Sequence, residues 1–289
     1  MKSVRKLLAW LGAATCMNLL AVATVEAAEP ICEPTKVSAK YPGLAGKTIR
    51  VGADPQTPPY VFRDGVAFDK VIGVDADLAR AVLECAGLKH EFVLGAWSGL
   101  LPAVQAGQID VMWDDLYHKP ERAKVVDFAT YMSAATGALV AAGNPKKIDS
   151  PDKLCGMTAS FALGSSNEIA VKKQDEACKA KGQPAINAMP FQDLASGLRL
   201  IDSGRADVIM WDLAFVDNLA HANKAKYARG FAIMDGFAVG AAVQKGNKEL
   251  LRAISEGLTV MQKDGTQKWI FEKYGVDPAL IVRSEIRVD

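Results

Sequence analysis

The sequence predicts an α/β protein of two similar lobes, each a three-layer α/β sandwich, joined by two crossing strands. Strand-like segments alternate with segments in which apolar residues recur at helical spacing. A unit made of a helix, a glycine and a strand ending in Trp-Asp occurs twice, in residues 98–114 and 196–212. The copies lie about a hundred residues apart, which favours two lobes over a short-period repeat array.

Residues 1–27 have the pattern of a secretory signal. Lys2, Arg5 and Lys6 precede an apolar stretch, and Val25-Glu-Ala27 fits a small-residue cleavage site. We therefore expect cleavage after Ala27 and export to the periplasm. A retained membrane anchor is the less favoured alternative, because no later stretch has the length and apolarity of a membrane span.

The rest of the chain has a nearly balanced charge, with one more acidic than basic residue once the signal is removed. A chain without a basic excess lacks the electrostatic footprint of a nucleic-acid-binding protein. Its length suits one large or two ordinary domains. Since 50% of all residues are hydrophobic, a packed core is expected rather than disorder.

Four cysteines follow the signal, an even number in an oxidising compartment. Their wide spacing resembles neither a zinc site nor a CxxC redox pair. We expect disulfides between Cys155 and Cys178, within the second lobe, and between Cys32 and Cys85, tying an extension over residues 28–47 to the end of the first helix. Two other pairings, or four buried thiols, remain open.

The first lobe begins with a strand over residues 48–53, which stops at the proline-rich loop Asp54–Pro59. Asp75 is expected to cap a helix that ends at Gly87. A strand over residues 91–95 and a helix from Trp97 to Gly107 follow.

An apolar strand over residues 109–113 ends abruptly at a group of polar side chains. Asp114, Asp115 and Tyr117 follow it, and Pro120 suits the first turn of a short helix that carries Arg122. In open α/β sheets, ligands gather where strands end. These side chains are therefore candidates for a binding site.

The second lobe repeats the alternation from Ser150 onward, with helices ending near residues 181 and 203 and strands near 185–189 and 207–211. Two small-residue strands, near 137–142 and 236–243, are expected to pair as a hinge between the lobes. The predicted first lobe comprises residues 48–138 and 240–289, and the second comprises residues 142–236. Two helices within 247–274 return to the first lobe.

These residues carry a resemblance to the extracellular solute-binding proteins of family 3, the polar amino acid-binding components of bacterial ABC transporters. Eight elements match in order, across residues 48–274: Asp54–Tyr60, Gly73–Leu78, Trp97–Pro102, Gly107–Asp110, Pro120–Phe128, Gly164–Ser166, Gly204–Val208 with Asp212, and Asp264–Thr266. The resemblance implies a type II periplasmic binding protein, with an inner-membrane permease as its partner, that works as a monomer without a cofactor.

The resemblance also assigns site residues. Arg122 matches the carboxylate-binding arginine of the family, and Asp212 matches its ammonium-binding aspartate. Ser165 and Ser166 begin a helix whose free N–H groups can complete the carboxylate's shell. Asp212 can also cap the helix after it, in addition to binding a ligand.

The chain departs from the family after the 109–113 strand, where many members carry small residues. Asp114 and Asp115 either face a second positive charge, which favours a basic amino acid, or bond backbone N–H groups or the opposite lobe. Tyr117 replaces a serine or threonine and narrows the pocket or offers a face to a cation.

Asp54, Tyr60 and Trp97 lie in matching motifs and are candidate ligand contacts, although both aromatic residues also suit a core. The three histidines lack metal-ligand spacing, so no metal is expected. No catalytic residue is predicted either. The rival functions are a cyclohexadienyl or arogenate type of dehydratase on the same fold, which needs a general acid, and a ligand sensor.

Overall fold

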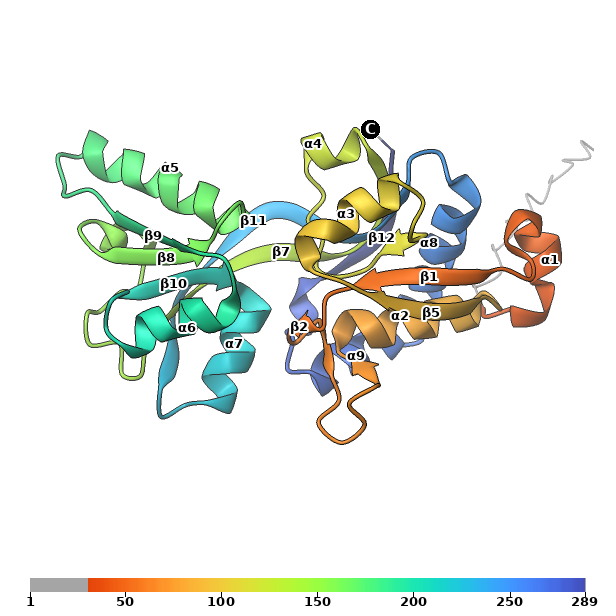
Figure 1. The fold of residues 1–289 in the computed structure, drawn as a ribbon, viewed down its shortest axis with the longest axis horizontal. Helices are drawn as coiled ribbons and strands as arrows, with labels where there is room; N and C mark the ends of the chain where they lie inside the picture. Colours follow the sequence, from red (N-terminus) through yellow and green to blue (C-terminus); the bar gives the residue numbers. More distant parts are fainter. Residues whose placement is uncertain (1–30, 289) are drawn as a thin grey trace, which may run out of the picture.

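A computed structural model describes residues 31–288. The predicted signal, residues 1–27, lies outside these residues. Two lobes stand side by side and are connected by two long strands, β7 (Val126–Ala141) and β11 (Tyr227–Gln244) (Figure 1). The predicted two-lobed α/β fold is therefore confirmed.

One continuous sheet runs through both lobes in the order β5-β1-β6-β11-β7-β10-β8-β9. In the first lobe, β1 (Thr48–Ala53) lies parallel to both β5 (Lys89–Leu94) and β6 (Val111–Met112). In the second lobe, parallel pairs join β8 to β10 and to β9; these strands are Thr158–Ala162, Val208–Asp212 and Asn187–Phe191. The arrow of β1, to which β6 is parallel, points toward the junction between the lobes (Figure 1). Asp212, the last residue of β10, lies at this junction, because it accepts a hydrogen bond from Tyr117 of the first lobe.

The helices of the first lobe are α2 (Val74–Cys85), α3 (Trp97–Gln105), α4 (Pro120–Ala123), α8 (Lys248–Lys263) and α9 (Thr266–Lys273). Those of the second are α5 (Ser166–Ala180), α6 (Leu194–Asp202) and α7 (Leu213–Ala222). Short pieces complete the chain: η1 (Pro34–Lys36), α1 (Val37–Lys40), η2 (Pro42–Leu44), η3 (Pro151–Leu154), η4 (Pro278–Leu280) and a small sheet of β2 (Gln56–Thr57), β3 (Val61–Arg63) and β4 (Val71–Ile72).

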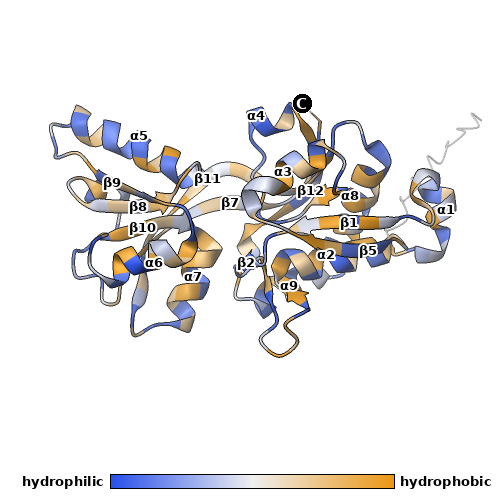
Figure 2. Ribbon diagram, in the orientation of Figure 1, coloured by the Kyte–Doolittle hydropathy of each residue, from blue (hydrophilic) through white to orange (hydrophobic). Residues whose placement is uncertain are grey.

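Amphipathic helices pack on the sheet with their apolar faces inward (Figure 2). On α2, the helically spaced residues Leu78, Val82 and Leu83 are completely buried. Gly257 lets α8 approach α2 closely, because a Cβ atom there would lie 2.8 Å from Cγ1 of Val82. This packing holds α2 against α8, and the first turn of α2 contributes to the candidate site described below.

Both predicted disulfides are present. Cys32 is joined to Cys85 and Cys155 to Cys178. The first holds the N-terminal extension against the end of α2, and the second joins the start of the second lobe to α5. Across residues 31–288, no helix combines the length and apolarity that crossing a membrane requires.

Two predictions differ from the structure in detail. Asp75 does not cap α2: Gly73 holds that position, and Asp75 is a buried residue of the first turn. The two small-residue segments lie on the paired strands β7 and β11, but their residues do not face one another, because Gly137 pairs with Ala232 while Ala238 pairs with Ser133. Both strands extend well beyond their small-residue parts, so each segment pairs with another part of the partner strand.

The strand predicted over residues 109–113 is shorter than expected, because only Val111–Met112 pairs with its neighbours. A C-terminal strand, β12 (Ile281–Arg287), was not predicted from the sequence. It pairs antiparallel with β7 at the edge of the first lobe. Its alternation of polar and apolar residues is weak, so only the tertiary pairing reveals it.

Candidate functional site

Asp212 is bonded to residues of both lobes. It ends β10 and caps α7, with Oδ1 accepting hydrogen bonds from the N–H groups of Ala214 (2.9 Å) and Phe215 (3.3 Å). The Tyr60 hydroxyl donates to Oδ1 at 2.6 Å, and the Tyr117 hydroxyl donates to Oδ2 at 2.9 Å. Because both tyrosines belong to the first lobe, the lobes meet directly at this carboxylate.

The carboxylates of Asp114 and Asp54 accept hydrogen bonds from other groups of the first lobe. Asp114 is completely buried and accepts 2.6 Å hydrogen bonds from the Asp54 N–H and the Thr57 hydroxyl. Asp54 in turn accepts bonds from the N–H groups of Gln56 (3.0 Å) and Trp97 (2.9 Å). For Asp114, this geometry matches the second alternative from the sequence, bonding to backbone N–H groups.

Asp115 has a different environment from its neighbour. Its backbone adopts a left-handed conformation, with φ of 45°. Its N–H donates to Oδ2 of Asp75 at 2.7 Å. Its own Oδ1 is buried and has no hydrogen-bond partner among residues 31–288. A buried carboxylate oxygen without a partner is costly, so this oxygen is a candidate acceptor for a ligand.

Arg122 lies beside Tyr117 and Trp97. Its Nη1 donates to the Tyr117 carbonyl at 2.9 Å, and its guanidinium carbon is 5.2 Å from the centre of the Trp97 ring. The Trp97 indole N–H donates to the Asp114 carbonyl at 2.9 Å, which holds the ring in place. We call Tyr60, Asp115, Tyr117, Arg122 and Asp212 the interlobe cluster.

Ser165 and Ser166 stand at the start of α5, as predicted. The Ser165 hydroxyl accepts a 3.2 Å bond from the N–H of Glu168, whose carboxylate accepts a 2.7 Å bond from the N–H of Gly164. Ser166 is the first residue of the helix. Within residues 31–288, no hydrogen bond joins either serine to Arg122 or Asp212, so the structure does not bring them into the interlobe cluster by direct bonding.

Burial dominates the electrostatics of the cluster. It raises the pKa of Asp212 to about 6, although the two tyrosine hydrogen bonds act in the opposite direction. Burial, followed by the negative charge of Asp212, raises the pKa of Asp115 well above its ordinary value. Burial lowers the pKa of Arg122, while Asp115 opposes that shift. Two carboxyl groups and one guanidinium therefore share a weakly solvated region.

Two contributors to the site were missed from the sequence. Asp75 accepts bonds from the Asp115 N–H and, at Oδ1, from the Tyr131 hydroxyl at 2.6 Å. Both Asp75 and Tyr131 are fully buried. Asp75 lies inside a motif that matched the family, so the motif was recognisable, but its partners lie 40 and 56 residues away.

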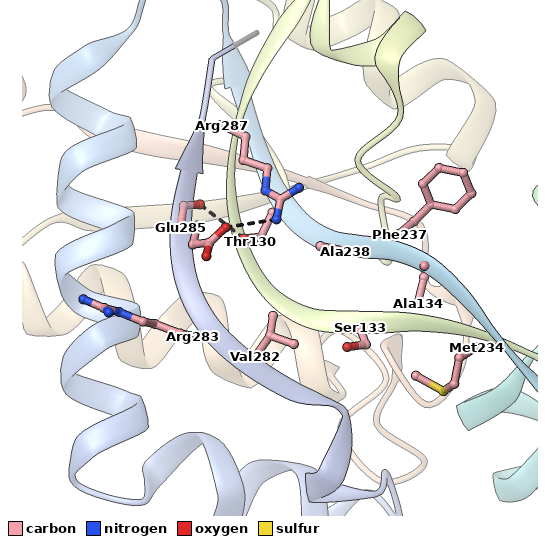
Figure 3. Close-up of a pocket in the computed structure, with 11 residues that line it drawn as sticks. Thr130, Ser133, Ala134, Met234, Phe237, Ala238, Val282, Arg283, Glu285 and Arg287 are labelled. Atoms are coloured by element: carbon pink, nitrogen blue, oxygen red, sulfur yellow. Dashed lines mark hydrogen bonds and ion pairs between the residues drawn. The ribbon is translucent and has the colours of Figure 1, made fainter.

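Among residues 31–288, no group of three or more His, Cys, Asp or Glu side chains is arranged to hold a metal ion. A pocket of about 340 Å³ lies elsewhere, between β12 and the crossing strands. Figure 3 shows Met234 and Phe237 on one side of it and Glu285 paired with Arg287 on the other. None of its lining residues belongs to the interlobe cluster.

Two α/β lobes on crossing strands, with charged and aromatic side chains meeting at their junction, define the class of two-lobed solute-binding proteins. The chain belongs to the bacterial extracellular solute-binding proteins, family 3, whose model matches residues 49–277.

Proteins named for binding amino acids are similar to this chain. The L-cystine-binding protein TcyJ of Escherichia coli (strain K12) is 29% identical over 280 residues, covering 93% of this chain and 98% of the relative. An ancestral arginine-binding protein bound to arginine is 34% identical, with a TM-score of 0.68 and coverage of 78% and 97%. An ancestral amino acid-binding protein, described as a precursor of cyclohexadienyl dehydratase, is 31% identical, with a TM-score of 0.66 and coverage of 83% and 98%.

Proposed function

We propose that this protein captures an amino acid between its lobes in the periplasm and delivers it to the permease of an ABC transporter. The single observation that carries the proposal is the convergence of Asp212 from one lobe with Tyr60, Tyr117 and Arg122 from the other. Family membership and relatives named for cystine and arginine support it.

The two ends of an α-amino acid match two charges of the interlobe cluster. Asp212 is assigned to the ligand ammonium and Arg122, with its planar fork, to the carboxylate. The start of α5 at Ser165 and Ser166 completes the carboxylate's shell when the lobes close on the ligand. Each charge-assisted bond contributes about 1.5 to 3 kcal/mol, so four support an affinity near micromolar, about −8 kcal/mol.

The charge balance of the cluster favours a ligand with a second positive charge. When both are ionised, Asp115 and Asp212 present two negative charges against the single guanidinium of Arg122. Burial and the charge of Asp212 raise the pKa of Asp115, so a further cation beside it would stabilise its ionised form. A neutral zwitterion leaves one negative charge uncompensated in a poorly solvated region, whereas arginine or lysine cancels it. The unpartnered Oδ1 of Asp115 is a suitable acceptor for the cationic side chain. We therefore assign the ligand to the basic amino acids.

Closure is proposed to occur about β7 and β11, near residues 137–142 and 236–243. The lobes on either side comprise residues 48–138 with 240–289, and residues 142–236. Register shifts in the pairing between Met234 and Ala238 support flexure there, because they interrupt the ladder between the lobes. The closed form is what the permease recognises, and a membrane sensor would read the same form.

Calorimetric titration tests the function with arginine, lysine, glutamine and glutamate as ligands. Arginine or lysine is expected to bind most tightly, and glutamate least. Tight binding of glutamate alone would reject the basic ligand. Arg122→Ala is expected to weaken binding by about 2 to 5 kcal/mol, since it leaves the ligand carboxylate unpaired. A native mass spectrum of the purified protein provides an independent check through any co-purified amino acid.

A periplasmic dehydratase is the second candidate, supported by similarity to the precursor of cyclohexadienyl dehydratase. The raised pKa of Asp115 suits a general acid that protonates a leaving hydroxyl. Incubation with prephenate or arogenate, followed by ultraviolet absorbance of an aromatic product, separates this function from binding. A solute-binding protein is expected to form no product.

A further inference from the structure

The backbone of Asp115 is held in an uncommon conformation by a neighbour outside the interlobe cluster. A φ of 45° is rarely adopted by a residue other than glycine and costs about 1 kcal/mol or more unless surrounding contacts maintain it. The contact that maintains it is the 2.7 Å hydrogen bond from the Asp115 N–H to Oδ2 of Asp75. The adjacent Asp114 is fixed separately, through Thr57 and the Asp54 N–H.

Asp75 is itself held on both sides. Its second oxygen accepts a 2.6 Å bond from the Tyr131 hydroxyl, and the Tyr131 carbonyl accepts a 3.0 Å bond from Nε2 of Gln267 on α9. Asp75 lies in the first turn of α2, where the helix dipole favours a negative charge. A connected set of bonds therefore runs from α9 through the crossing strand β7 to the loop after β6.

We infer that Asp75 is a positioning residue for ligand selectivity: by accepting the Asp115 N–H, it aims the Asp115 carboxylate toward the junction of the lobes, where the second positive charge of the ligand lies. This inference rests on the proposed function, since it assumes a cationic ligand. In this role Asp75 does not contact the ligand but acts on it through Asp115.

The carboxylate of Asp75 accepts from two donors at once, on two different oxygens. An asparagine has one acceptor oxygen, so it can accept from only one of these donors. Its NH₂ group then either faces the Asp115 N–H, which is also a donor, or donates to the Tyr131 hydroxyl, which must reverse its direction; both arrangements disturb the bonds that hold Asp115. Burial raises the pKa of Asp75 to about 6, so at neutral pH the ionised form with two acceptors prevails.

Arginine and citrulline provide a matched pair of ligands, because they have nearly the same shape and differ by the guanidinium charge. The ratio of their dissociation constants is measured by calorimetry for the wild type, Asp75→Asn, Asp115→Asn and the double variant. Asp75→Asn is expected to reduce the preference for arginine about tenfold, toward the value of Asp115→Asn. The double variant is expected to resemble Asp115→Asn alone, because both changes remove one function.

Asp127→Asn is the matched control. Asp127 is also a buried aspartate of the first lobe, 3% exposed, and accepts a 2.8 Å bond from a backbone N–H, that of Gly246. This variant is expected to retain the wild-type arginine-to-citrulline ratio. In ¹⁵N-labelled ligand-free protein, the amide signal of Asp115 is expected to move in Asp75→Asn and to stay unchanged in Asp127→Asn.

The inference would be overturned if folded Asp75→Asn kept the wild-type ratio of arginine and citrulline dissociation constants while Asp115→Asn lost its preference for arginine. That result would leave the proposed function intact.

If Asp75→Asn does not fold, Tyr131→Phe is the second variant, because it removes only the hydroxyl that donates to Oδ1 of Asp75. That variant is expected to lower the ratio in the same direction, and an unchanged ratio would count against the inference. A wild type that binds neither ligand, or both equally, refutes the cationic ligand and the inference with it.

Discussion

The hydroxyl of Tyr117 donates a 2.9 Å hydrogen bond to Oδ2 of Asp212 and thereby joins the two lobes. Tyr60 makes a second bond to the same carboxylate, at 2.6 Å. The ammonium group of the proposed ligand would donate to the same Asp212 carboxylate as these two hydroxyls. The tyrosines therefore stabilise a closed arrangement of the two lobes, which the proposed ligand would reinforce.

Tyr117→Phe is expected to open the ligand-free protein. Loss of a bond between a neutral donor and a charged acceptor shifts the balance toward the open form by about tenfold. Small-angle X-ray scattering of the ligand-free variant is expected to show a larger radius of gyration. Tyr227→Phe is the control, because its hydroxyl bonds to Asp202 at 2.6 Å within the second lobe. Equal radii for wild type and Tyr117→Phe would contradict the role of Tyr117.

Asp212→Asn is expected to weaken amino acid binding by about 2 to 5 kcal/mol, because it leaves the ligand ammonium without a charged partner. The asparagine oxygen can still cap α7, so the fold is retained. Asp207→Asn, immediately before the start of the strand that Asp212 ends, removes a carboxylate that accepts from the Thr158 N–H at 2.9 Å. Calorimetry is expected to find wild-type affinity in the Asp207 variant; an equal loss in both would argue against a specific site.

The affinity for a basic amino acid is expected to rise with pH through about 6. Burial raises the pKa of Asp212 to about 6, and the ligand requires the charged carboxylate. Asp115, whose pKa is also raised by burial, acts in the same direction. Arg122 stays protonated across this range. Titrations at about pH 5 and about pH 7.5 measure the change, and a pH-independent affinity would be inconsistent with these carboxylates contacting the ligand.

Asp212 is expected to make the stability of the ligand-free protein fall with rising pH, which is opposite to its effect on ligand affinity. Its pKa is higher folded than unfolded, so the folded state binds more protons between about pH 4 and 6 and loses stability as pH rises through that range. Asp110 and Glu168 have lowered pKa values and oppose this trend. The comparison with Asp212→Asn isolates the effect: stability of the variant relative to wild type is expected to increase with pH, and a constant difference in unfolding free energy would contradict it.

The disulfide that closes the longer loop is expected to stabilise the chain slightly more, because the loop-closure entropy grows with the logarithm of loop length. Cys155 and Cys178 are 23 residues apart, and Cys32 and Cys85 are 53 apart. In the chain-entropy model, removal costs about 3.5 and about 4 kcal/mol respectively. Denaturant unfolding of the paired Cys→Ser variants measures this cost. Ligand affinity is expected to change little, since neither bond contacts the interlobe cluster; a larger loss of affinity than of stability would contradict this.

Much of the fold could be predicted from local patterns. Helical spacing located α2, Pro120 marked the start of α4, and Ser165 with Glu168 marked the start of α5. The expected pairing of the cysteines was one of three that the sequence left open, and the structure confirms it. β12 escaped prediction because its identity as a strand depends on β7, more than 140 residues earlier in the chain.

The residues of the candidate site also fall into two groups: those that the sequence predicted, and those whose role only the tertiary structure shows. The sequence alone determined which strand ends carry charged groups, and it named Asp115, Arg122 and Asp212, because these residues lie in short motifs. Only the tertiary structure decided that Asp114 is satisfied internally while Asp115 is not, that Asp75 supports Asp115, and that two tyrosines meet Asp212. Those bonds join residues from 40 to 152 positions apart. Hydrogen-bond partners at such separations are set by how the sheet and helices pack, which no local pattern encodes.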